Sequence, residues 1–268
     1  MKLSTRLCLV ALGLSGAVSL HAVELKPETT QAFDRYIKLT EAELDQRMSA
    51  KNFLDVDKHP RDKSALWLGQ PQVRPHKTLD QGQEIEIPGG LMQDWIGAIF
   101  LPGVTLEKVR GVLQDYANYK NYFRPDVIES RLDKRDGDRF DIFLRLYKTQ
   151  FLTVVLNTKY SVQYGQLDPT RLYINSHSTR IAEVKNPKKK KYDQEKTPGD
   201  DDGLLWRINS YWRVQEADNG VYAELEAVSL SRDIPLGLGF LLKGFLEQFP
   251  RESMENTLQG LKQAVGVH

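Results

Sequence analysis

The sequence of 268 residues contains a single cysteine, Cys8, so a disulfide within the chain and a cysteine zinc site are both excluded. It also lacks a charge excess: 37 basic residues stand against 36 acidic ones, a formal net charge of +1. Nucleic-acid-binding domains usually carry a strongly basic surface, so we expect no nucleic acid among the partners. Because disulfides and a cysteine zinc site are excluded, the chain must be stabilised by a hydrophobic core of its own.

The first 22 residues have the three-part organisation of a secretory signal peptide. Lys2 and Arg6 precede an apolar run from Leu7 to Val18, and Ala22 is the small residue at the presumed cleavage position. A membrane anchor is the weaker alternative, because the run is shorter than the ~20 residues that a span requires. We predict cleavage after Ala22 and export to the periplasm or the exterior, with a mature net charge of about −1 once Lys2 and Arg6 are removed.

Residues 23–88 are expected to form an N-terminal helix and an irregular connector. The spacing of Phe33, Ile37, Leu44 and Met48 predicts one apolar face on a helix over residues 28–49, docked on the main body. From residue 52 to residue 88 the periodicity fades, and prolines at 60, 71, 75 and 88 indicate loops. A short strand over 84–87 is the element that we expect within this connector.

Residues 89–268 are expected to form one further domain, rich in strands. A strand over 91–101 is followed by a helix that Thr105 can cap, and then by a short aromatic helix around Tyr119 and Tyr122. Alternating apolar residues joined by hairpin turns then predict an antiparallel run of six strands. They are expected at residues 127–132, 139–148, 151–164, 171–184, 204–214 and 221–231.

The C-terminal run 236–265 predicts a long helix with one apolar stripe, interrupted by a kink or a break at Pro250. The stripe consists of Leu238, Leu242, Phe245, Phe249, Met254, Leu258, Leu261 and Val265. A helix this apolar needs a large surface to cover. We therefore predict an α+β fold in which a curved antiparallel sheet wraps around this helix, with space between them.

Three stretches of this domain resemble the START-like superfamily, also called the polyketide cyclase, Bet v 1-like or SRPBCC group. They are the strand-to-helix step 98–109, the segment Leu113-Gln-Asp-Tyr with Tyr119 and Tyr122 ahead of Pro125, and the hairpin 128–140. The resemblance extends over about residues 89–266. Within the superfamily, this segment is similar to the bacterial coenzyme-Q-binding and polyketide-cyclase-like proteins. It implies the helix-grip fold and the binding of a lipid, quinone or polyketide-like aromatic between the sheet and the last helix.

Aromatic and aliphatic side chains on the strands and at the helix start are candidates for lining the ligand space. They are Trp95, Tyr122, Tyr160, Trp206, Trp212, Phe240, Leu241 and Phe245. Each of them alone is equally typical of an ordinary core, so the architecture favours a cavity more than any single residue does. Access is expected near residues 237–244, where glycines cluster at the helix start.

No sequence motif points to a cofactor or a metal. The glycines at 237, 239 and 244 do not have the GxGxxG spacing and are followed by no further strand, and no GxSxG, HExxH or paired-histidine pattern occurs. Asp200–Asp202 lacks the spacing of a calcium loop. His177 is a weak catalytic candidate, because a histidine titrates near neutrality, and the alternative is a half-exposed strand residue.

Two charged features remain. The run Lys188–Lys191 could touch anionic lipid headgroups transiently, although neighbouring acidic residues favour a solvated loop. Strand parity places Arg207, Glu224 and Glu226 opposite the apolar faces, which predicts an ion-pair ladder on the outer face of the sheet. The alternatives to a ligand carrier are a cyclase- or hydratase-type enzyme that uses the same pocket, and a protein-interaction module built on the N-terminal helix.

Overall fold

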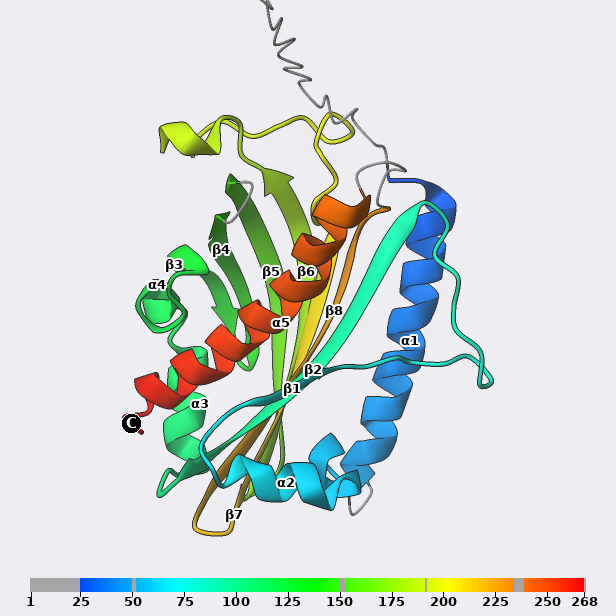
Figure 1. Cartoon of the computed structure of the whole chain (residues 1–268). Helices are drawn as coiled ribbons and strands as arrows, with labels where there is room; N and C mark the ends of the chain where they lie inside the picture. Colours follow the sequence, from blue (N-terminus) through cyan, green and yellow to red (C-terminus); the bar gives the residue numbers. More distant parts are fainter. Residues whose placement is uncertain (1–24, 50–51, 150–152, 191, 234–238, 268) are drawn as a thin grey trace, which may run out of the picture.

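One open, curved antiparallel sheet and a long C-terminal helix form the body of the molecule, which has the α+β helix-grip fold (Figure 1). The computed structural model describes residues 25–49, 52–149, 153–190, 192–233 and 239–267, with the side chains of 239–248 outside this description. The predicted fold class is confirmed, including the additional N-terminal helix.

The sheet has eight strands in the order β1-β2-β8-β7-β6-β5-β4-β3, and every neighbouring pair is antiparallel. The strands are β1 (Gln72–Pro75), β2 (Gly90–Pro102), β3 (Val127–Asp136), β4 (Arg139–Thr149), β5 (Thr153–Asp168), β6 (Arg171–Glu183), β7 (Arg207–Ala217) and β8 (Gly220–Arg232). β3 to β8 are the six strands that the alternation predicts. β8, the last strand in the sequence, pairs with β2 and so connects β1 and β2 to the run of six strands.

The helices are α1 (Pro27–Ser49), α2 (Pro60–Leu66), α3 (Leu106–Gln114), α4 (Tyr119–Tyr122) and α5 (Gly239–Ala264), with 3₁₀ turns at Asp55–Lys58, Tyr116–Asn118 and Pro187–Lys189. The Thr105 hydroxyl accepts from the Lys108 backbone N–H at 3.3 Å, so the predicted cap begins α3. Among the described residues, none of the helices has the length and apolar character needed to cross a bilayer.

α5 lies across the inner, concave face of the sheet (Figure 1). The second half of its predicted stripe is buried: Met254, Leu258, Leu261 and Val265 are at most 8% exposed. The helix continues through Pro250, so the predicted break does not occur. It packs closely on β2 at Gly97, where an added Cβ would lie 2.8–2.9 Å from Met254 and Leu258 side-chain atoms.

α1 is docked on the main body, as its apolar stripe predicts, and it covers the outer face of the sheet. Phe33, Ile37 and Leu44 are buried in a second core cluster with Tyr211 and Val228 of β7 and β8. Both faces of the central strands are therefore covered, one by α5 and the other by α1. This explains why β2 is apolar on both of its sides.

The connector between α1 and β2 differs from its prediction. Residues 84–87 form no strand, because Ile85 and Ile87 pack against the outer cluster instead of pairing with a neighbouring backbone. The strand in this segment is β1, which pairs with β2 at residues 95–98. An edge strand has one unpaired side, so it tolerates the proline at position 75 that hid it in the sequence.

Candidate functional site

An internal cavity of about 280 Å³ lies between the inner face of the sheet and α5. Its wall is predominantly apolar and draws on β2, β4, β5, β7, β8 and the second half of α5. Aliphatic lining comes from Leu144, Leu146, Val154, Leu156, Ile208, Leu225 and Met254. Leu144 and Leu146 of β4 alternate along their strand, as do Val154 and Leu156 of β5, so these aliphatic residues come from one face of the sheet.

Three of the predicted ligand residues line this cavity: Trp95, Tyr160 and Trp212. They belong to β2, β5 and β7, so the sheet brings together rings that are far apart in the sequence. Burial raises the pKa of Tyr160 to about 12, which keeps its phenol neutral and able to donate a hydrogen bond at neutral pH.

One end of the cavity carries a buried charged group. The Lys148 ammonium lies 2.8 Å from the Asp126 carboxylate and 3.7 Å from Glu252 of α5. Ser253 donates to the other Asp126 oxygen at 2.6 Å, and the Lys148 ammonium lies 5.0 Å from the ring centroid of Phe249. A predominantly apolar space thus contains one charged group, which suits a ligand with an oxygen-bearing head and an apolar body.

The remaining predicted ligand residues are not at this cavity or lie outside the described part. Tyr122 sits beside α3, where its hydroxyl donates to Asp115 at 2.7 Å. Trp206 lies in a bend ahead of β7, so strand parity does not extend to it, and it packs in the outer cluster against α1. The side chains of Phe240, Leu241 and Phe245 lie outside the described part, as do the other side chains of the predicted access region 237–244.

His177, the weak catalytic candidate, lies on the outer face of the sheet. Its Nε2 is 2.8 Å from the Glu41 carboxylate of α1, which also accepts from Tyr211 at 3.0 Å. The hydrogen bond from His177 holds the pKa of Glu41 below its usual range, although burial opposes it. The whole sheet separates His177 from the cavity, so it fits the alternative of a half-exposed strand residue that pairs with α1.

Glu224 and Glu226 lie on the outer face as predicted, but they form no ladder with Arg207 and are buried under α1. Glu224 and Glu226 are each 2% exposed. The Arg47 guanidinium of α1 donates to Glu224 and lies 4.0 Å from Glu226. Burial raises the pKa of Glu224, while Arg47 opposes that rise. Arg207 takes no part and donates instead to the Trp206 carbonyl at 2.9 Å.

A histidine outside the predicted set completes this outer network. His76, directly after β1, contacts both Asp94 and Glu226. Burial lowers its pKa, but the hydrogen bond to Asp94 and the pairing with Glu226 outweigh burial and raise the pKa to about 10. Nothing in the spacing of residues 76, 94 and 226 indicates that they meet, because the contact depends on sheet topology.

No family model and no curated protein matches this chain. Solved structures are similar to it: a STAR-related lipid transfer protein from Xanthomonas axonopodis is 16% identical, with 72% of this chain and 98% of that one covered and a TM-score of 0.48. The Zhui aromatase/cyclase from Streptomyces sp. R1128 is 11% identical, with 65% of this chain and 94% of that one covered and a TM-score of 0.46. Human STARD10 is 12% identical, with 79% of this chain and 80% of that one covered and a TM-score of 0.44.

Proposed function

We propose that this protein binds a hydrophobic small molecule, of the lipid, quinone or polyketide-like aromatic class, between the sheet and α5. The apolar cavity of about 280 Å³ carries the proposal. Burying apolar ligand surface contributes ~25 cal/mol per Å², which is enough to hold a ligand without covalent chemistry. The Lys148–Asp126 end favours a ligand that has at least one polar oxygen over a plain hydrocarbon.

The cavity lining favours a carrier over the two alternatives. An enzyme of the cyclase or hydratase kind needs an acid or base that titrates near neutrality, but the raised pKa of Tyr160 leaves it a neutral phenol. His177, the other candidate, lies on the opposite face. An interaction module would have a filled interior, whereas this interior holds a cavity.

A matching ligand is expected to stabilise the folded protein by about 2.7 kcal/mol at a hundredfold excess over Kd. For a chain of this size that corresponds to a rise of roughly 5–10 °C in the melting temperature. The measurement is a thermal melt with a panel of fatty acids, quinones and polycyclic aromatics. Trp95 and Trp212 line the space, so quenching of tryptophan fluorescence should accompany the shift.

A cavity-filling variant provides the specificity control. Ala227 lines the cavity from β8, so Ala227→Phe should abolish the thermal shift while the protein stays folded. Ala117 is exposed, and Ala117→Phe makes the same chemical change away from the cavity, so it should respond to the ligand as wild type does. If no compound in the panel shifts the melt, or if Ala227→Phe shifts as much as wild type, binding in this cavity is wrong.

We also propose that the protein is exported, with Val23 as the first residue of the mature chain. The basic, apolar and small-residue order of the first 22 residues supports this. N-terminal sequencing of protein from the periplasmic or secreted fraction is expected to begin at Val23. Recovery of soluble chains that retain Met1 would contradict it.

A further inference from the structure

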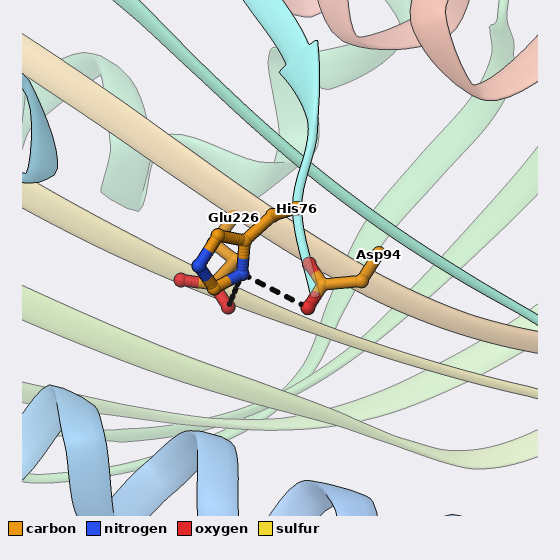
Figure 2. A group of neighbouring side chains, drawn as sticks. All are labelled: His76, Asp94 and Glu226. Atoms are coloured by element: carbon orange, nitrogen blue, oxygen red, sulfur yellow. Dashed lines mark hydrogen bonds and ion pairs between the residues drawn. The ribbon is translucent and has the colours of Figure 1, made fainter. Parts of the chain in front are cut away.

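Three ligand-type side chains meet on the outer face of the sheet, away from the cavity (Figure 2). His76 follows β1, Asp94 belongs to β2 and Glu226 belongs to β8. His76 Nδ1 lies 3.1 Å from Asp94 Oδ2 and 3.5 Å from Glu226 Oε1. The three donor atoms are all within 4.8 Å of one another, and the two carboxylate side chains are only 2–3% exposed.

These separations suit a shared cation. Zinc–ligand bonds of roughly 2.0–2.2 Å in a tetrahedron put neighbouring donor atoms about 3.3–3.6 Å apart. The two histidine–carboxylate separations of 3.1 and 3.5 Å already lie close to that edge length. One imidazole with two carboxylates is a donor set that suits zinc and manganese.

A second observation points to a missing partner at the same place. Asp94 Oδ1 is a buried oxygen that accepts no hydrogen bond among the described residues, and Glu226 Oε1 is approached by His76 Nδ1 only at 3.5 Å. Arg47 does not supply that partner, because its guanidinium approaches the other Glu226 oxygen, Oε2, at 4.0 Å. Two adjacent buried carboxylates with open lone pairs are costly unless a cation lies between them.

The surroundings hold the donor atoms in place. Tyr36 of α1 donates to Asp94 Oδ2 at 2.7 Å, and the Thr78 backbone N–H donates to the Tyr36 oxygen at 2.7 Å. The His76 backbone N–H donates to the Asp94 carbonyl at 2.8 Å, which fixes the segment after β1 against β2. In metal sites, contacts of this kind orient the side chains that bind the ion.

We propose that His76, Asp94 and Glu226 bind one divalent metal ion of the zinc or manganese class. The ion would join the N-terminal connector, which provides His76, to β2 and β8, and so fasten the α1 region to the sheet. The site is structural and does not depend on ligand binding in the cavity. The competing arrangement is a protonated His76 that pairs with both carboxylates and leaves no place for a metal.

The test is metal titration of tag-free protein after chelator treatment and dialysis, with ZnCl₂ and MnCl₂ as separate probes. We expect one ion per chain by calorimetry and a higher melting temperature in the loaded protein. His76→Gln and the conservative Asp94→Asn should each weaken binding by at least about tenfold. Circular dichroism verifies that both variants are folded, and if one does not fold the other decides.

His177→Gln is the matched control. His177 lies on the same face and contacts one carboxylate, Glu41, at 2.8 Å, where the proposed site has two. This variant should bind metal as wild type does. The proposal is overturned if the wild-type protein takes up no stoichiometric zinc or manganese, or if His76→Gln binds as tightly as wild type. In either case the proton on His76 is the sole cation between the two acids.

Discussion

Replacing Arg47 with alanine is expected to lower the free energy of unfolding by about 3–5 kcal/mol, because it leaves a buried carboxylate without its counter-charge. Arg47 is 8% exposed and donates both to Glu224 and, at 3.0 Å, to the Phe53 carbonyl. Without it, the hydrogen bonds left to Glu224 among the described residues are those from the backbone N–H groups of Asp55 and Val56, at 2.7 and 3.4 Å. Urea unfolding followed by circular dichroism measures the loss.

Arg35→Ala is the matched control on the same helix. Arg35 pairs with Asp80, but its side chain is 66% exposed, so its removal should cost less than about 1 kcal/mol. The contrast between the two variants tests whether α1 covers the outer face in solution. A loss for Arg47→Ala as small as that for Arg35→Ala would show that it does not.

The inner face of the molecule could be predicted from the sequence because local periodicity encodes it. Val221, Ala223 and Leu225 alternate with polar residues and are all buried against α5 and its neighbours. The stripe of α5 repeats at helical spacing, so its buried side follows from the sequence alone. The cavity residues Trp95, Tyr160 and Trp212 could be chosen on the same grounds.

The burial of the outer face could not be predicted in the same way, since a polar residue that alternates with apolar ones on a strand normally indicates a solvent-exposed position. Glu224 and Glu226 alternate with apolar residues as exposed strand residues do, and yet they are buried. The reason is that α1 covers them, and its Arg47 is 177 positions before Glu224 in the chain. The apolar side of α1 showed that the helix must dock, but not on which face. Trp206 and His177 were therefore candidates for a cavity from which the sheet separates them.

β1 and His76 show the same limit at shorter range. Pro71 precedes β1 and Pro75 is its last residue, and its pairing with β2 depends on the return of residues 72–75 to the sheet edge. Once that pairing exists, His76 arrives beside Asp94 and Glu226 without any sequence motif. The cluster combines one residue each from β2 and β8 with the residue after β1, so it depends on the sheet topology and no sequence spacing typical of metal ligands could indicate it.

Replacing Leu258 with alanine is expected to cost about 2–5 kcal/mol of the free energy of unfolding, because the site cannot collapse around the missing atoms. Leu258 is fully buried in the inner core and lies against Gly97 of β2. Gln263→Ala, at an exposed position of α5, should stay within about 0.5 kcal/mol of wild type.

Gly97→Ala adds a further test, since its new methyl group would lie 2.9 Å from Leu258 Cδ1. Contacting sites are not additive, so the double variant should lose less stability than the two single changes summed. Equal melts for Leu258→Ala and Gln263→Ala would mean that α5 does not pack on the sheet.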